Sequence, residues 1–261
     1  MDSMTLNSKI ERISGTERKK IKDTVIREYP LTIFLNNKEL VTLLCSPTNL
    51  DYLAIGFLQS EGFIKDKTDI IDIKLDARNS SINITISASE DIIEQKASRK
   101  RTLTTGCGKG TTFNDINNVP SACLIDTPVY ITPQKIRDLI NNLQQKAINF
   151  KSTGAAHVSG LASNEELILA YEDIGRHNAL DKLFGKCVLD GIRVDDKIIV
   201  TSGRISTEMI IKCAKRRIPI LISRSAPTSL AIEFAKQRGL TLIGFVRGER
   251  INIYANGWRV K

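Results

Sequence analysis

The segment Lys197–Arg250 decides the fold, because an apolar run, a loop and a helical stretch recur in it. The first unit is "KIIVTSGRIS" followed by "TEMIIKCAKRR" (197–217), the second is "IPILISRSAPTS" followed by "LAIEFAKQR" (218–238), and "GLTLIGFVRGER" (239–250) closes the series. Short strands that are apolar on both faces and alternate with helices are typical of parallel strands joined by right-handed crossovers. The segment therefore predicts parallel strands whose carboxyl ends share one edge of a sheet.

An arginine follows each of these strands. The loops "TSGRIS", "SRSAPT" and "FVRGER" bring to the shared edge several hydroxyls and the side chains of Arg204, Arg224, Arg247 and Arg250. Open α/β sheets bind ligands at this edge, and arginines beside helix N-termini suit phosphate groups. Helix capping explains some of the hydroxyls, but it does not explain an arginine in every loop. The edge is a candidate phosphate-binding site.

The chain before this segment divides into smaller units. Thr132 and Pro133 are typical of an N-cap and a first helical residue, and they predict a helix to about Asn149. Earlier, we expect a hairpin that turns at Asn36 and Asn37, a striped helix that ends at Gly62, and a second hairpin around "RNSS" (78–81). The predicted domains are a polar N-terminal tail (1–24), an α+β lobe with the Cys107 loop (25–130) and an α/β lobe (131–261).

Two further elements are expected at the start of the second lobe. The stretch "AAHVSGLASNEELILAYEDIG" (155–175) predicts a hairpin that turns at Ser163–Glu165. "NALDKLFGKCVLDG" (178–191) predicts a helix stopped by Gly191, with Cys187 on its apolar stripe. Cys187 is therefore interpreted as an inert core residue.

Composition indicates a globular intracellular protein. With 261 residues and 41% hydrophobic content, the chain can bury a core without a metal or a disulfide framework. Its five cysteines are odd in number and widely spaced, which is typical of reduced thiols and predicts the cytoplasm. The first residues lack the apolar segment of a secretory signal, and no apolar run approaches the roughly 18 residues of a membrane span. We expect no membrane association.

The positive charge raises the question of an anionic partner. Lys and Arg number 38 against 29 Asp and Glu, which gives a net charge of +9. The stretch "KASRKRTLTTGCGK" (96–109) carries positive side chains and no acidic residue, and it includes Cys107. A nucleic-acid partner is disfavoured, because only 5% of residues are aromatic and no basic stretch alternates with stacking side chains.

Cys107 lies among three glycines in "TLTTGCGKGTT" (102–112), which allows three interpretations. A phosphate-binding P-loop fails, because Leu103 occupies the position of its first glycine and Gly110 that of its Ser or Thr. A zinc site is disfavoured, because the sequence holds two histidines, no C-x-x-C and no H-x-E, which also excludes zinc deaminase chemistry. A reactive thiol on a basic loop remains, and from these residues alone an inert exposed cysteine stays open as well.

Seven ordered blocks carry a resemblance to a known family. They are "LTIFLNNKELVTLLCSPTNLDYLAIGFLQSEGFI", "TTGCGKG", "TGAAHVSG", "EDIGRHNALDK", "TSGRISTEMIIKCA", "ILISRSAPTSLAIEFA" and "LIGFVRGERINIY", and they run from Leu31 to Tyr254. The chain closely resembles the formate dehydrogenase accessory sulfurtransferase family (FdhD). The resemblance implies a cytidine-deaminase-like fold without zinc ligands in the α/β C-terminal lobe, beside the smaller α+β N-terminal lobe.

The resemblance also implies an activity. It is that of a cytoplasmic homodimer that accepts a sulfane sulfur from a cysteine desulfurase and passes it to the molybdenum cofactor, Mo-bis(molybdopterin guanine dinucleotide), for formate dehydrogenase. By motif, Cys107 matches the persulfide-bearing cysteine. The family's cofactor-binding segment corresponds to Phe245, Val246, Arg247, Gly248, Glu249 and Arg250. A guanine nucleotide is expected to fit the same site, and no resident metal is implied.

The sequence departs from the family in one respect and leaves some roles open. Many members have C-x-x-C in the cysteine loop, whereas Gly110 here removes a second thiol that could release the sulfur. A cofactor-binding and insertion chaperone, with Cys107 only a contact, is the alternative function. His157 and His177 are candidate proton donors, with a structural role as the simpler interpretation. The acidic pair Glu172–Asp173 can position a guanine base or cap a helix, and capping is the simpler role.

Overall fold

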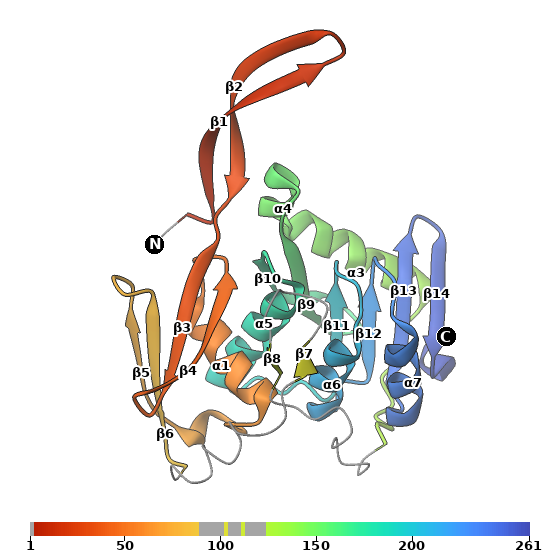
Figure 1. The fold of residues 1–261 in the computed structure, drawn as a ribbon. Helices are drawn as coiled ribbons and strands as arrows, with labels where there is room; N and C mark the ends of the chain where they lie inside the picture. Colours follow the sequence, from red (N-terminus) through yellow and green to blue (C-terminus); the bar gives the residue numbers. More distant parts are fainter. Residues whose placement is uncertain (1–2, 89–101, 104–110, 113–123) are drawn as a thin grey trace.

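Two lobes lie side by side, and a hairpin projects from them (Figure 1). The structure is a computed structural model that describes residues 3–88, 102–103, 111–112 and 124–261. Cys107 lies outside the described residues, as do most of the residues around it. Within the described part, no helix has both the length and the apolar character to span a bilayer.

The first lobe is a mixed sheet covered by a helix. Its described strands have the order β4-β3-β6-β5, from β3 (Tyr29–Leu35), β4 (Lys38–Cys45), β5 (Ile70–Asp76) and β6 (Ser81–Ile86). The predicted turn is confirmed, since Asn36 and Asn37 both have positive φ, as the turn of a two-residue hairpin requires. Helix α1 (Leu50–Glu61) packs its apolar residues on this sheet and ends at Gly62 in the left-handed region, as predicted. A short 3-10 helix (Lys67–Asp69) leads into β5.

The second lobe has a mixed sheet between two layers of helices. Its described strands have the order β10-β9-β11-β12-β13-β14. They are β9 (His157–Ala162), β10 (Leu167–Asp173), β11 (Ile198–Thr201), β12 (Ile220–Ser223), β13 (Thr241–Arg247) and β14 (Arg250–Ala255). The predicted parallel arrangement of β11, β12 and β13 is confirmed. The mixed α/β class is therefore confirmed, and its cytidine-deaminase-like form stays a prediction.

Helices cover both faces of this sheet. Helix α3 (Pro133–Lys146) packs on one face with Ile136, Leu139, Ile140 and Leu143. On the other face lie α5 (Arg176–Asp190), α6 (Thr207–Lys215) and α7 (Ser229–Arg238), whose apolar residues form a separate core (Figure 1). Thr132 caps α3 as predicted, accepting a hydrogen bond from the Lys135 N–H. The short helix η3 (Gly257–Arg259) ends the chain beside β13.

Some boundaries differ from the predictions. The expected polar tail is instead a hairpin of β1 (Thr5–Ser14) and β2 (Glu17–Ile26), which contains many charged side chains. The helix expected to reach Asn149 breaks at Ala147, and α4 (Ile148–Thr153) follows. Ile125, placed in the first lobe by the expected boundary, packs in the core of the second lobe and donates its N–H to the Arg238 carbonyl.

The two lobes meet through α1 and α5, which approach closely at two glycines. A Cβ on Gly56 would overlap the carbonyl of Asp181, and a Cβ on Gly185 would overlap the carbonyl of Tyr52. Only glycine permits this distance between the helices.

The short strands β7 (Thr102–Leu103) and β8 (Thr111–Thr112) pair with each other.

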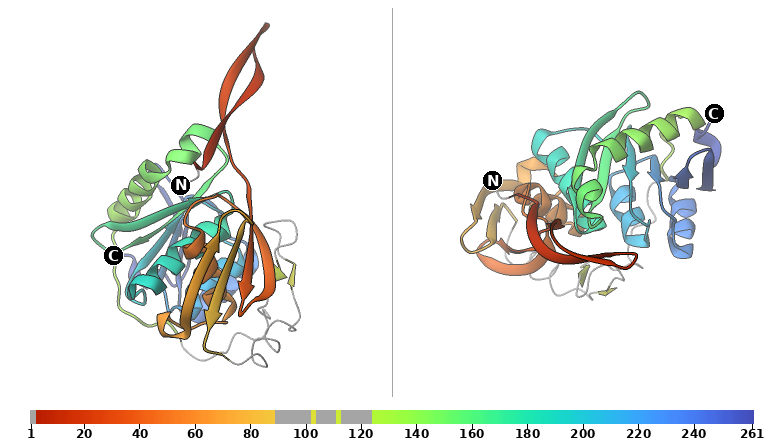
Figure 2. Two further views of the ribbon diagram at one scale, coloured as in Figure 1. Left: turned by 90° about the vertical axis from the view of Figure 1, so that its left-hand side faces the viewer. Right: turned by 90° about the horizontal axis from the view of Figure 1, so that it is seen from above.

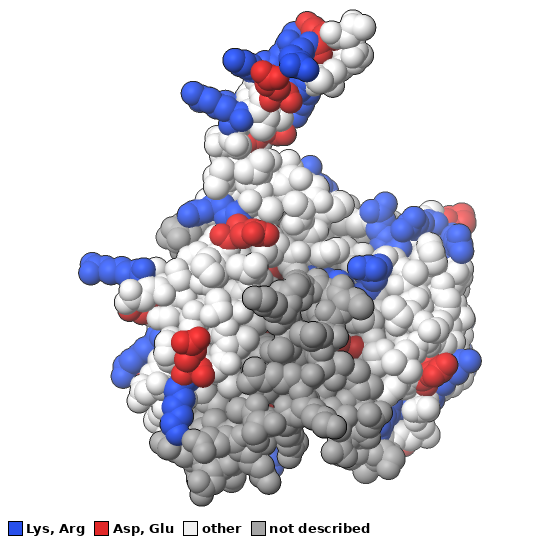
Figure 3. Space-filling model, viewed as in Figure 1, with Lys and Arg blue, Asp and Glu red and all other residues white. Residues whose placement is uncertain are grey.

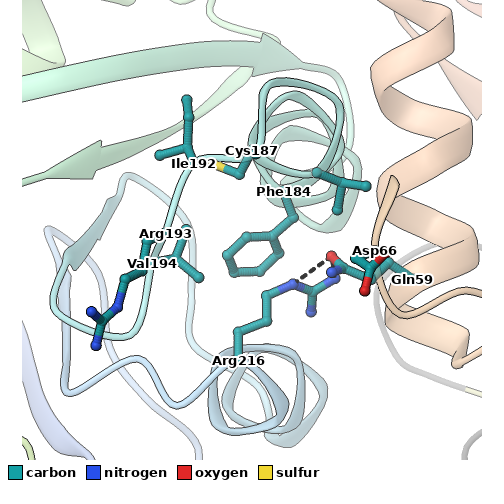
Figure 4. A pocket seen from close by; sticks show the side chains of 10 residues that line it. Gln59, Asp66, Phe184, Cys187, Ile192, Arg193, Val194 and Arg216 are labelled. Carbon is teal, nitrogen blue, oxygen red and sulfur yellow. Dashed lines mark hydrogen bonds between the residues drawn. The ribbon is translucent and has the colours of Figure 1, made fainter. Parts of the chain in front are cut away.

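Arg216, the C-cap of α6, adds a polar link between the lobes. Its Nε donates to the Gln59 side chain at 2.8 Å, and its guanidinium lies 3.9 Å from the centre of the Phe184 ring (Figure 4). These groups line a pocket of about 230 Å³ that also contains Cys187. Because Arg216 ends α6, this pocket lies away from the carboxyl edge of the sheet, where α6 begins. Burial lowers the pKa of Arg216 to about 10.

Candidate functional site

The carboxyl ends of β11, β12 and β13 form the predicted cationic edge. Arg204, Arg224, Arg247 and Arg250 are all exposed. The loops after β12 and β13 are joined, because the Arg247 Nε donates to the Arg224 carbonyl at 3.2 Å. Lys and Arg side chains gather on the surface at the free end of the β13–β14 hairpin (Figure 3). The parallel register brings these arginines to one edge, as the sequence predicted.

The predicted cofactor segment is the tight turn between β13 and β14. Arg247 and Arg250 pair across it, and Gly248 has a positive φ. Phe245 also has a positive φ, a conformation that is rare for an aromatic residue and is common at functional sites. Its ring lies 5.4 Å from the Arg247 guanidinium and 4.5 Å from that of Arg250. Both guanidinium groups are therefore held over one aromatic ring.

A polar pocket of about 210 Å³ lies beside this turn. Its lining combines α3 with the predicted segment: Gln134, Arg137, Ile140, Asn141, Val246, Gly248 and Glu249. Arg137 lies 3.5 Å from the Glu249 carboxylate, so the acidic residue of the segment is held toward α3. Val246 is buried in the core of the second lobe and anchors the segment. Of the predicted segment, Val246, Gly248 and Glu249 line this pocket, and the cofactor-binding role of the segment stays a prediction.

A second cationic group lies where β9, α5 and the loop after β11 meet. His157 begins β9, and Arg176 is the first residue of α5. A Cβ on Gly203 would lie 2.9 Å from the Arg176 Cβ and 3.5 Å from the His157 ring, so both side chains lie close to the Gly203 backbone. Burial, followed by the charges of Arg176 and Arg204, lowers the pKa of His157. The sequence prediction missed Arg176, although it stands in "EDIGRHNALDK" directly before the candidate His177.

His177 lies in a buried hydrogen-bonded cluster beneath this edge. Its Nε2 is 3.1 Å from the Ser206 hydroxyl, and its Nδ1 is 3.3 Å from the Glu208 carboxylate. Glu208 also faces Lys212, which donates to Asp181. Burial, with the charges of Lys212 and Arg176, lowers the pKa of His177 to about 3. His177 is therefore neutral at physiological pH, which fits a structural role better than that of a proton donor.

The two acidic residues before α5 have different roles: Glu172 caps α4, and Asp173 joins the lobes. Glu172 accepts the backbone N–H groups of Asn149 and Phe150 at the start of α4. Asp173 accepts the Gly175 N–H and forms a fully buried ion pair with Lys182 at 2.7 Å. The second oxygen of Asp173 also accepts the Ser46 N–H from the first lobe at 3.0 Å. The capping role is therefore confirmed for Glu172, whereas Asp173 serves as the partner of Lys182 and does not cap α5.

The described cysteines are buried and weakly acidic. Burial raises the pKa of Cys45 to about 12, of Cys187 to about 11 and of Cys213 to about 12. Cys187 is an inert core residue, as predicted. Cys107, the predicted catalytic residue, lies outside the described residues. Among the residues that the structure describes, no group of three His, Cys, Asp or Glu side chains has a metal-binding arrangement.

Known proteins similar to this chain cover nearly all of it. A model of the FdhD/NarQ family matches residues 26–261. The sulfur carrier protein FdhD of Bacillus subtilis (strain 168) is 40% identical over 260 residues, with 100% of this chain and 99% of the relative covered. The protein of the same name from Listeria innocua serovar 6a is 38% identical over 255 residues, with 97% of each chain covered.

A solved structure is also similar. It is the crystal structure of a candidate formate dehydrogenase accessory protein from Desulfotalea psychrophila, with a TM-score of 0.79 and 27% sequence identity. The similarity covers 99% of this chain and 100% of that chain. It therefore extends over both lobes. The resemblance drawn from the seven sequence blocks is confirmed, and the chain belongs to the FdhD/NarQ family.

Proposed function

We propose that this protein is a sulfur carrier that serves formate dehydrogenase. Support comes from relatives named sulfur carrier protein FdhD, which match at about 40% identity over the full chain. The similar crystal structure is that of a candidate formate dehydrogenase accessory protein. The sulfur is carried as a persulfide on Cys107, and the protein acts as a sulfurtransferase in the cytoplasm.

The observation that supports this proposal most directly is that the described thiols are buried and protonated. Cys45, Cys187 and Cys213 are buried, and their raised pKa values keep them protonated at physiological pH. Sulfur transfer requires a thiolate. Of the five cysteines, the three described ones are therefore unsuited to the reaction, which leaves Cys107 and Cys123. The basic, glycine-rich sequence around Cys107 favours a thiolate there.

The first step is a thiol exchange with a cysteine desulfurase. The Cys107 thiolate attacks the outer sulfur of the persulfide on the desulfurase. A sulfur–sulfur bond forms on Cys107 as the donor's sulfur–sulfur bond breaks, and the donor leaves as a thiolate. No oxidant is consumed. Because position 110 is glycine, no neighbouring thiol in this loop competes for the bound sulfur.

The acceptor is the molybdenum cofactor in its bis(guanine dinucleotide) form, bound at the cationic edge before it enters formate dehydrogenase. Arg247 and Arg250 bind its phosphates with charge-assisted hydrogen bonds, and Arg204 and Arg224 extend the site. The shared ring of Phe245 holds the first two guanidinium groups near each other before the ligand arrives. The functional unit is a homodimer.

Replacing Cys107 with alanine distinguishes the carrier from a chaperone that only binds and inserts the cofactor. In cells that lack the native protein, Cys107→Ala is expected to abolish formate dehydrogenase activity while guanine nucleotide binding survives. Cys213→Ala is the matched control, because its thiol is buried and un-ionised. If Cys107→Ala retained full activity, the chaperone would be the better description.

A further inference from the structure

The pocket at the border of the lobes has no part in the proposed function. It lies where α1 and α5 run side by side, away from the cationic edge (Figures 1 and 2). Its volume is about 230 Å³, below the roughly 300–1,000 Å³ of pockets that hold drug-sized ligands. A water molecule takes up about 30 Å³ in the liquid, so the pocket has room for roughly seven or eight non-hydrogen atoms. A nucleotide or the molybdenum cofactor is too large for it.

One wall of the pocket is apolar. It comes from the last turns of α5 and from the loop that follows: Phe184, Cys187, Val188, Ile192 and Val194. The loop turns back at Gly191, which has a positive φ, and the Ile192 N–H donates to the Cys187 carbonyl. The Cys187 thiol adds no charge to this wall, because burial raises its pKa to about 11. A hydrocarbon group can therefore pack against it.

A second wall carries a positive charge that has no ionic partner. Arg216 donates from Nε and Nη2 to the Gln59 side-chain oxygen at 2.8 and 2.6 Å. Its Nη2 also donates to the Ser60 hydroxyl, and its Nη1 donates to the Lys212 carbonyl. Asp181 acts on Arg216 only through space, because the two Asp181 oxygens accept from Ser60 and Lys212. Among the described residues, no carboxylate lies within ion-pair distance of Arg216, which a pKa of about 10 keeps charged at physiological pH.

The Gln59 amide holds the position that a carboxylate would fill. Its single oxygen accepts from both Nε and Nη2 of Arg216, a fork that carboxylates occupy with two parallel hydrogen bonds. The guanidinium lies 3.9 Å from the centre of the Phe184 ring, which holds this fork beside the apolar wall (Figure 4). A buried charge that pairs only with neutral groups is costly, so an anion in place of the amide would stabilise it. The two walls together favour a carboxylate that carries a hydrocarbon chain.

Asp66 limits the ligand to one negative charge. Its carboxylate lines the pocket and accepts from the Thr68 hydroxyl and N–H, which lowers its pKa and keeps it ionised. Arg193, the other cation of the described lining, pairs with Asp195. A second anionic group on the ligand would therefore meet Asp66 without a cation to balance it. A dicarboxylate or a phosphate is disfavoured on this ground.

We propose that this pocket binds a small aliphatic monocarboxylate, of the class of branched short-chain fatty acids. The carboxylate accepts both hydrogen bonds of the Arg216 fork in place of the Gln59 oxygen, and the hydrocarbon chain packs against the apolar wall. The displaced amide retains a partner, because its nitrogen donates to the Lys65 carbonyl at 2.9 Å. The site is separate from the sulfur carrier's chemistry, since none of its lining residues belongs to the cationic edge.

Calorimetric titration of the full-length protein with isovalerate tests this proposal. We expect saturable binding of isovalerate and at least about tenfold weaker binding of isovaleramide, which has the same shape without the charge. Arg216→Gln should lower the isovalerate affinity by about tenfold or more, because it removes the charged fork. Arg217→Gln is the matched control, since it removes the same charge from a neighbouring side chain that pairs with Asp126 outside the pocket. It should bind isovalerate like the unchanged protein.

A second variant keeps the test decisive if Arg216→Gln does not fold. Gln59→Glu supplies the missing carboxylate from the chain itself, so it should weaken isovalerate binding by about tenfold or more. Gln145→Glu adds the same charge at an exposed position of α3 and should leave the affinity unchanged. The proposal would be overturned by an unchanged protein that does not bind isovalerate, by equal affinity for the amide, or by unaltered affinity in Gln59→Glu. No sulfur donor or nucleotide is present, so sulfur transfer is not tested here.

Discussion

At the scale of single residues, His177 shows how burial sets the protonation state of a group beneath the cationic edge. Its side chain is 11% exposed, and Lys212 and Arg176 disfavour a further positive charge. The ring is therefore neutral; its Nε2 lies 3.1 Å from the Ser206 hydroxyl and its Nδ1 lies 3.3 Å from the Glu208 carboxylate. The sequence identified this histidine but could not reveal its environment, because Ser206 and Glu208 come from another helix.

This environment predicts a pH dependence of stability. The pKa of His177 is about 3 in the folded protein, against an ordinary value of 6.5. Between these values the unfolded chain binds a proton that the folded chain does not, so stability is lost as pH falls through 6.5 toward 3. His177→Gln should remove roughly 2 kcal/mol of the loss in unfolding free energy between pH 7 and pH 5. Urea unfolding at both pH values measures it.

His157 is present in both the unchanged protein and His177→Gln. Its contribution to the pH dependence of the unfolding free energy therefore cancels when the two proteins are compared. Equal pH dependence of the unchanged protein and His177→Gln would show that His177 is protonated in the folded state. The ion pair between Glu208 and the imidazole would then explain the geometry, and a proton-donor role would regain support.

At the scale of elements, the contact between α1 and α5 fixes how the lobes sit. Alanine is a better helix former than glycine by about 1 kcal/mol, so propensity alone predicts that Gly185→Ala stabilises α5. Packing predicts the opposite, because the added methyl group would overlap the Tyr52 carbonyl. Overpacking typically costs 1–3 kcal/mol, so we expect a lower midpoint of urea unfolding. A raised midpoint would mean that the helices separate easily.

Elements whose ends are set by local chemistry could be predicted from the sequence. The Asn36–Asn37 turn, the Thr132 cap and the glycine ends of α1 and α5 are confirmed. The β1–β2 hairpin was missed, because its many charged residues hide the alternation of Leu6, Ile10, Ile21 and Val25, although Gly15 marks its turn. The break at Ala147 was missed because α4 is capped by Glu172, a residue distant in sequence.

The candidate site could be predicted from the sequence only in part. Arg204 and Arg224 follow the ends of β11 and β12, and Arg247 is the last residue of β13, so parallel topology alone brings them to one edge. The stacking of Arg247 and Arg250 on Phe245 was not predictable, since it depends on the positive φ of Phe245. Arg176 was missed because its contact with Gly203 joins two segments distant in sequence.

At the scale of the whole molecule, the cationic edge should bind a guanine nucleotide mainly through its phosphates. Arg247→Ala/Arg250→Ala is expected to weaken GDP binding by about tenfold or more, because charge-assisted hydrogen bonds are lost. The GDP affinity of this variant should also depend less on salt concentration than that of the unchanged protein. Calorimetric titration at two salt concentrations measures both effects.

The matched control for this variant is Arg193→Ala/Lys197→Ala. These side chains pair with neighbouring carboxylates and precede β11, at the opposite end of the sheet from the cationic edge. Replacing both side chains with alanine should leave GDP binding unchanged. Equal weakening by both variants would mean that overall positive charge, rather than the edge, attracts the nucleotide.

The central claim is that Cys107 carries the sulfur, and intact mass measures this most directly. After incubation with a cysteine desulfurase and free cysteine, the protein should gain about 32 Da, one sulfur atom, and lose it on treatment with a reductant. Cys213→Ala should gain the same mass, and Cys107→Ala should gain none. A protein that gains no mass, or a Cys107→Ala variant that still gains it, would contradict the account.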